Sequence, residues 1–142
     1  MNCGSAQSSF QQQPAKPKDH MNLHLDSRSV GGVAVLYCKG RLAFGEGLDA
    51  LYEKVGRLLH GKSPVLLHFG DVQAIDAAGI GVLADLVAHA SEWGGQLRLC
   101  NVPEQVAEVI SLTRLAGALE CYDTEQDGLA SYLGVAAFWR AS

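Results

Sequence analysis

Apolar and polar residues follow two different periods along most of this chain. Residues 22–30 and 33–39 have the character of strands, and Gly31-Gly32 separates them, so they predict two strands joined as a hairpin. The next segment has the i, i+3, i+4 spacing of one buried helical stripe, which ends at Gly61. Its members are Leu48, Leu51, Tyr52, Val55, Leu58 and Leu59.

The alternation of strand and helix continues to residue 133. Residues 65–69 are continuously apolar, as expected of a central strand covered on both faces. A helix is predicted from Asp76 to about Trp93, followed by a strand over residues 96–100. Asn101 and Glu104 have the spacing of a capping box for a further helix. A short strand over 119–122 and a helix over 124–133 complete the pattern.

This order of elements predicts one α/β domain. An opening hairpin followed by strand–helix alternation favours a mixed sheet of about four to five strands with helices as crossovers. Residues 1–20 are rich in Gln, Ser and Pro and are expected to be a disordered tail. The domain is expected over residues 21–134, with a C-terminal tail over 135–142. Met21 directly precedes the first strand, which leaves the true start open between Met1 and Met21.

Composition narrows the function classes. The 142 residues are 48% hydrophobic, enough for one domain with a real core, and the net charge of −4 disfavours a nucleic-acid backbone as partner. No apolar run is long enough to cross a bilayer, and no secretory signal is visible, so a cytoplasmic location is expected. Cys38, Cys100 and Cys121 lie in or beside strands and are interpreted as small buried apolar residues.

The most informative segment is Asp76-Ala77-Ala78-Gly79-Ile80-Gly81, between a buried strand and an amphipathic helix. An aspartate there can cap the helix, because its carboxylate accepts from the free amides of the first turn. A helix N-terminus is also suited to phosphate groups. However, Ala77 and Ala78, which follow the aspartate, carry no hydroxyl.

This segment resembles the signature of the STAS domain, the fold of anti-sigma factor antagonists and of the cytoplasmic domains of sulfate transporters. The resemblance runs from about Met21 to about Leu133 and includes three further motifs. These are Gly40-Arg41-Leu42, Trp93-Gly94-Gly95-Gln96-Leu97 and Leu112-Thr113-Arg114-Leu115-Ala116-Gly117. Family members typically read Asp-Ser-Ser/Thr-Gly-Leu/Ile-Gly at the central segment, and a partner kinase phosphorylates a serine of that pair.

The resemblance implies that Ala77 and Ala78 occupy the phosphoacceptor place, where they cannot be phosphorylated. A second family feature, an aspartate after Gly-Glu-Leu, is also absent, because the corresponding stretch reads Gly40-Arg41-Leu42-Ala43. A phosphoserine would place two negative charges in a dry interface and drive a partner away. The hypothesis is therefore partner binding without this switch.

The central helix is predicted to bury Ile80, Leu83, Ala84 and Val87, which fall within one arc at about 100° per residue. Its opposite arc is unusually apolar and is interpreted as a docking surface. That arc holds Ala78, Val82, Leu86, His89 and Trp93, together with Asp85. The predicted partner-binding residues are Asp76, Gly79, Val82, Leu86, His89 and Trp93.

By resemblance, the partner is an anti-sigma factor with a histidine-kinase-like ATPase fold. The alternative is the ATPase subunit of a lipid-transport ABC complex, to which a STAS subunit can bind as an accessory. Homodimerisation through the apolar arc is left open. No catalytic, metal-binding or cofactor-binding pattern is recognised, so an enzyme is not expected.

Overall fold

The computed structural model describes residues 23–133 of the chain. The two tails predicted from the sequence, residues 1–20 and 135–142, lie outside these described residues.

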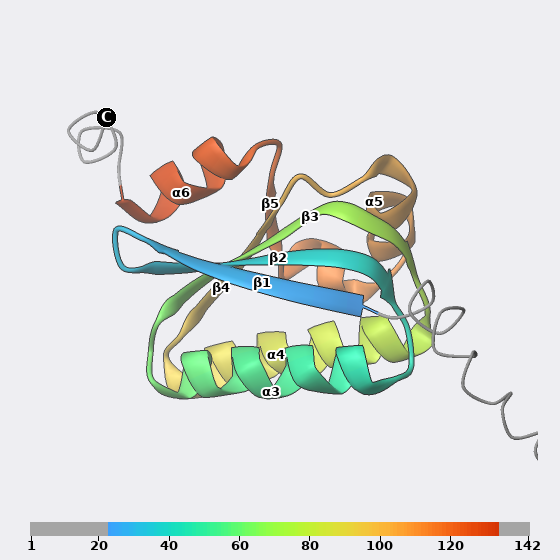
Figure 1. The fold of residues 1–142 in the computed structure, drawn as a ribbon, viewed down its shortest axis with the longest axis horizontal. Helices are drawn as coiled ribbons and strands as arrows, with labels where there is room; N and C mark the ends of the chain where they lie inside the picture. Colours follow the sequence, from blue (N-terminus) through green and yellow to red (C-terminus); the bar gives the residue numbers. More distant parts are fainter. Residues whose placement is uncertain (1–22, 134–142) are drawn as a thin grey trace, which may run out of the picture.

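The described residues form one five-stranded mixed sheet in the order β1-β2-β3-β4-β5 (Figure 1). The opening pair is antiparallel, and every later neighbouring pair is parallel. The strands are β1 (Leu23–Val30), β2 (Val33–Leu42), β3 (Pro64–Ile75), β4 (Gln96–Cys100) and β5 (Glu120–Tyr122). The predicted fold class, a single α/β domain with helices as crossovers, is confirmed.

Within residues 23–133, three α-helices and one 3₁₀ turn connect successive strands, and a fourth α-helix follows β5. They are α3 (Glu46–His60), α4 (Ala77–Trp93), α5 (Glu104–Ser111), η1 (Arg114–Gly117) and α6 (Glu125–Leu133). One face of the sheet packs against α3, α4 and α5, whose buried side chains share a core with Leu36, Leu67 and Leu99. The other face packs against α6 through Leu129 and a smaller cluster that includes Val35 and Leu66 (Figure 1). Both faces of β3 are therefore covered, which is why residues 65–69 are apolar apart from half-buried His68.

The central strands run further than the hydrophobic pattern predicted. β3 continues past the apolar run to Ile75, and β2 continues to Leu42. Their pairing persists across two register shifts, so that Arg41 lies opposite Ala74 and Leu42 opposite Ile75. This extension brings the end of β2 next to the start of α4.

Two local predictions are wrong. Asn101 adopts a left-handed backbone conformation (φ 55) and α5 begins after Pro103 without a side-chain cap, so the predicted capping box does not form. Proline fits this position because its backbone φ of −62 is close to the value that its ring imposes. The helix also needs no hydrogen bond from the N–H that proline lacks. Cys121, predicted to be buried, is exposed on the edge strand β5, whereas Cys38 and Cys100 are buried as predicted.

No helix within residues 23–133 has both the length and the apolar character that a membrane span requires.

Candidate functional site

Asp76 connects three segments at the start of α4. Its backbone is extended (φ −114), and its carboxylate Oδ1 accepts a hydrogen bond from the Gly79 amide at 2.9 Å. Its Oδ2 accepts from the Phe44 amide at 3.4 Å, and its own amide donates to the Leu42 carbonyl at 3.1 Å. The predicted N-cap is thus confirmed. The same side chain also holds the β2–α3 loop against the first turn of α4.

Gly79 is buried beneath this first turn. A Cβ at residue 79 would collide with the backbone carbonyl of Leu42 and would lie 2.8 Å from Ile75 Cγ1. Only a residue without a side chain lets the helix approach the end of β2 this closely. Gly79 was predicted to contact a partner, and its burial means that it acts by placing the first turn of α4 rather than by direct contact.

The two residues after Asp76 occupy different environments. Ala77 is exposed to solvent at the first position of α4, whereas Ala78 is half-buried and packs against the core. No Ser, Thr or Tyr occurs between residues 71 and 82. The exposed start of α4 therefore presents a methyl group and free backbone amides, with no hydroxyl to accept a phosphoryl group.

Phe44 is a site residue that the sequence reasoning missed. It lies in the β2–α3 loop, one residue before Gly45, and its side chain is 89% exposed. A lone aromatic residue between Ala43 and Gly45, outside any periodic pattern, was the available signal. The hydrogen bond from its amide to Asp76 places Phe44 beside the start of α4.

The predicted orientation of α4 is wrong by about one residue, or ~100° of helix rotation. The buried positions are Gly79, Leu83, Leu86 and Ala90, whereas Ala84, predicted to be buried, is exposed. Leu86, predicted to project outward, is completely buried, so it does not belong to a docking surface. The exposed face carries small residues at Ala77, Gly81, Ala84 and Ala88, together with Asp85 and Glu92.

The remaining members of the predicted docking arc lie on the flank of α4 that meets α3. Val82, His89 and Trp93 are half-buried, and Val82 and Trp93 pack against the core. The Tyr52 hydroxyl and His89 Nε2 share a hydrogen bond of 3.0 Å. The His89 ring stacks on Trp93 with centroids 4.5 Å apart, and His60 of α3 meets Trp93 edge-on. This apolar flank is explained by helix–helix packing, because α3 and α4 lie side by side (Figure 1).

A second polar cluster anchors α6 to the opposite face of the sheet. The Tyr37 hydroxyl donates to Glu125 Oε2 at 2.9 Å, and His68 Nε2 lies 3.9 Å from Glu125 Oε1. Partial burial and the neighbouring Glu125 carboxylate raise the pKa of Tyr37 above its ordinary value, so its hydroxyl stays protonated and donates. His68 Nδ1 accepts from the Gly70 amide at 3.1 Å. Because each polar group here has a structural partner, this cluster is best explained as an attachment of α6.

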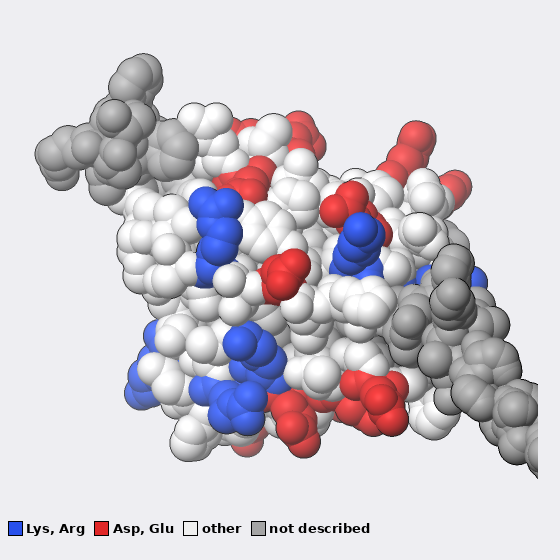
Figure 2. All heavy atoms as spheres, in the orientation of Figure 1, with Lys and Arg blue, Asp and Glu red and all other residues white. Residues whose placement is uncertain are grey.

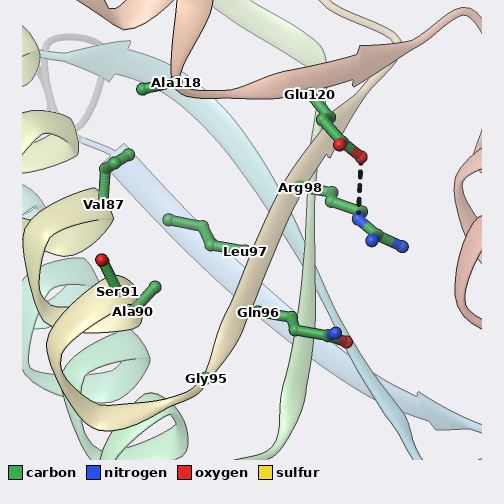
Figure 3. A pocket seen from close by; sticks show the side chains of 9 residues that line it. All are labelled: Val87, Ala90, Ser91, Gly95, Gln96, Leu97, Arg98, Ala118 and Glu120. Atoms are coloured by element: carbon green, nitrogen blue, oxygen red, sulfur yellow. Dashed lines mark ion pairs between the residues drawn. The ribbon is translucent and has the colours of Figure 1, made fainter.

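A hollow of about 220 Å³ lies at the other end of α4, where the helix meets β4 and β5 (Figure 3). Val87, Ala90 and Leu97 line its apolar side. The Arg98 Nε atom lies 3.1 Å from Glu120 Oε1, and its guanidinium also donates to Ser131 and stacks over Tyr132. This arginine is already engaged by protein groups, so it has little capacity to bind an anion.

Among residues 23–133, no group of three or more His, Cys, Asp and Glu side chains is arranged to hold a metal ion.

Known proteins with similar sequences and folds are consistent with the architecture described above. A model of the STAS domain matches residues 24–128. A candidate anti-sigma factor antagonist of Thermotoga neapolitana, a homologue of TM1081, is 32% identical over 74 residues, which are 52% of this chain. That stretch spans 66% of the relative's own length, just under two thirds.

Two solved structures share the fold. The crystal structure of TM1081 from Thermotoga maritima, also a candidate anti-sigma factor antagonist, has a TM-score of 0.64 and 24% identity, covering 75% of this chain and 92% of that one. The anti-sigma factor antagonist SpoIIAA in its unphosphorylated form has a TM-score of 0.67 and 16% identity, covering 79% and 98%. At these identities the two structures support the fold alone.

Proposed function

From the premise that this chain belongs to the STAS family, we propose that it is an anti-sigma factor antagonist without a phosphorylation switch. It binds a kinase-type anti-sigma factor through the β2–α3 loop and the first turn of α4. Because no side chain there can accept a phosphoryl group, the kinase activity of the partner does not dissociate the complex.

The observation that carries this proposal is the exposed first turn of α4, which begins with Ala77. Asp76 caps this turn and Gly79 seats it on β2, so its position is fixed by the fold. Because the start of the helix has no hydroxyl, it cannot be phosphorylated. The two negative charges of a phosphate, which would disrupt an interface with a partner, therefore cannot be added there. The turn remains a small, mostly uncharged contact surface at all times.

The family membership and the relatives' names support the class of partner. The relatives that resemble this chain over its domain are candidate anti-sigma factor antagonists, and the domain here has the same fold. By resemblance, the anti-sigma factor would have a kinase-like ATPase fold. Of the predicted contacts, Asp76 remains in the proposal, whereas Val82, His89 and Trp93 lie beyond the first turn of α4 and His89 and Trp93 are engaged with α3. Ala78 and Gly79 do not contact the partner in this proposal. They pack against the core and the end of β2 and so position the contact surface.

A matched pair of substitutions on α4 tests this proposal. Ala77 and Ala84 are both exposed alanines on the same helix, two turns apart. Ala77→Asp places a carboxylate at the proposed contact. It is also expected to leave folding intact, because an acid in the first turn of a helix is favourable by about 0.3–1 kcal/mol. Ala84→Asp introduces the same charge farther along the helix.

The wild-type chain and both variants would be expressed with a tag, and co-purifying proteins would be identified by mass spectrometry. An anti-sigma factor recovered with the wild type and with Ala84→Asp, but lost from Ala77→Asp, is the expected result. Recovery of a transporter ATPase instead would contradict the proposal and favour an accessory subunit. Equal recovery of an anti-sigma factor in all three samples would refute the assigned contact surface.

A further inference from the structure

Phe44 is the most exposed large apolar residue in the described part of the chain. Its side chain is 89% exposed, and Leu112 is next at 84%. Single exposed apolar residues are common on protein surfaces, so exposure alone assigns no role. The position of Phe44 relative to the start of α4 is what distinguishes it.

The fold fixes Phe44 beside the proposed contact surface. Its amide donates to Asp76 Oδ2, the carboxylate that also caps α4. The residues around it are small, since Ala43 precedes it in the loop and Ala77 follows Asp76 on the helix. A large, exposed aromatic side chain therefore follows one alanine in the loop and lies near the helix start that carries another. This is the geometry of an anchor that fills a pocket on a partner, and aromatic anchors of this kind carry much of the binding energy of interfaces.

The charges around Phe44 restrict the chemistry of that pocket. Glu46 and Asp49 lie in the first turn of α3, immediately after the loop, and Asp76 lies on the α4 side. Half-buried Arg41 is the one basic residue within three positions of Phe44 in the sequence. Over α3, acidic side chains lie toward the right-hand end in Figure 2 and basic ones toward the left, so the loop adjoins the acidic end.

A second copy of this chain is a poor occupant for this surface. In a symmetric dimer, the same patch would face itself, which would bring the Glu46 and Asp49 carboxylates of two copies together. Like charges in direct opposition are strongly unfavourable, and interfaces commonly reject wrong partners in this way. The acidic rim favours a different protein with a basic one.

We propose that Phe44 is the anchor of the interface with the anti-sigma factor and that it inserts into an apolar pocket rimmed by Lys or Arg side chains. This inference rests on the proposed function. It adds that the partner presents an apolar pocket with a basic rim. The centre of the contact is apolar and is not altered by phosphorylation. Charge complementarity is confined to the edge. Edge charges of this kind mainly accelerate association and make it sensitive to salt.

The test measures affinity by titration calorimetry, with the anti-sigma factor recovered by the wild-type chain as the probe. Phe44→Ala is expected to weaken binding by about 30-fold or more, as for a residue at the centre of an interface. Leu112→Ala, which removes a nearly equally exposed apolar side chain from the end of α5, is expected to change affinity by less than about 3-fold. Circular dichroism and thermal unfolding should show that both variants fold like the wild type, because neither side chain is buried.

The acidic rim is tested separately by Glu46→Gln. It is expected to slow association at low salt and to reduce the dependence of affinity on ionic strength, because one charged contact is removed. An unchanged salt dependence would overturn the proposed basic rim of the pocket.

The possible outcomes separate this inference from the proposed function. Loss of binding in Ala77→Asp with wild-type binding in Phe44→Ala would leave the proposed function standing and overturn the role of Phe44. Equal losses in Phe44→Ala and Leu112→Ala would also overturn it, because the anchor would not be specific. If no anti-sigma factor is recovered with the wild type, the proposed function fails and the role of Phe44 fails with it. Phe44-dependent self-association in sedimentation would show that a second copy is the occupant and would overturn it as well.

Discussion

Two glycines in the first turns of α4 should respond in opposite directions to the same substitution. Gly79 and Gly81 are both replaced by alanine, which is favoured over glycine in a helix by about 0.8–1.0 kcal/mol. At Gly81 the new Cβ has no atom within 4 Å, so the full gain of about 1 kcal/mol is expected. At Gly79 the new Cβ meets the backbone carbonyl of Leu42 and lies 2.8 Å from Ile75 Cγ1.

The cost at Gly79 has two parts. Relieving the overlap requires α4 to move away from β2, and overpacking of this kind costs about 1–3 kcal/mol. The same movement weakens the Gly79-to-Asp76 cap, which is worth about 1 kcal/mol. After the propensity gain is subtracted, Gly79→Ala should destabilise the protein by about 1–3 kcal/mol. The two variants should therefore differ by about 2–4 kcal/mol.

The assay is urea unfolding followed by circular dichroism at pH 7, with the free energy of unfolding obtained from linear extrapolation. Gly81→Ala should move the midpoint upward and Gly79→Ala should move it downward, with similar slopes. If both substitutions stabilise the protein to the same extent, then α4 does not rest on the end of β2. The account of how the site is positioned would then be wrong.

Three further predictions concern the cap, the attachment of α6 and a buried thiol. Asp76→Ala should lower the free energy of unfolding by about 1 kcal/mol in the same urea assay, whereas Asp76→Asn keeps an acceptor oxygen and should lose less. Tyr132→Phe removes a hydroxyl that donates to the Val65 carbonyl at 2.7 Å, and it should cost about 1 kcal/mol; an unchanged midpoint would show that this bond contributes nothing. Burial raises the pKa of the Cys38 thiol from 9.0 to about 12, so above pH 9 the unfolded chain releases this proton first and the folded state loses stability as the pH rises. The Cys38 contribution to this loss should approach about 1.4 kcal/mol per pH unit in urea titrations up to pH 10.5, and buried Cys100, whose pKa is also raised to about 12, adds its own. Cys38→Ala should therefore show a shallower decline than the wild type; equal declines would refute the shift.

The sequence predicted the fold well because the hydrophobic periods are clear in most elements. The apolar stripe that ends at Leu59 can be buried on one side only if the segment is a helix. The apolar run at residues 65–69 is short and typical of a buried strand. Asp76 was also predictable as a cap, because its role depends on backbone groups within three residues. These features are local, and single-sequence patterns describe local structure well.

The orientation of α4 could not be predicted in the same way. Four of its exposed positions are alanine or glycine and only Asp85 and Glu92 are charged, so hydropathy separates the exposed face poorly from the buried one. The flank with His89 and Trp93 appeared to be a free apolar surface because the contact with α3 involves residues that are about 30–40 positions away in sequence. Phe44 was missed for a related reason. Its importance arises from a hydrogen bond to Asp76, 32 residues later, which no local pattern reveals.

The orientation of α4 also changes how the surface should be tested. A charged substitution at Leu86 would place a carboxylate in the core, because this side chain is completely buried. Burying an unpaired charge costs several kcal/mol, so such a variant would lose binding by unfolding. Ala77→Asp and Phe44→Ala act on exposed side chains and report on the surface itself.

The central claim is that this domain binds an anti-sigma factor without a phosphorylation switch at α4. The most direct measurement is the affinity of the purified pair with and without Mg-ATP, combined with the intact mass of this chain and peptide mapping of residues 71–82 after incubation. The account predicts the same affinity in both conditions and no added phosphoryl group in that segment. Phosphorylation of this chain accompanied by loss of binding in Mg-ATP would contradict it.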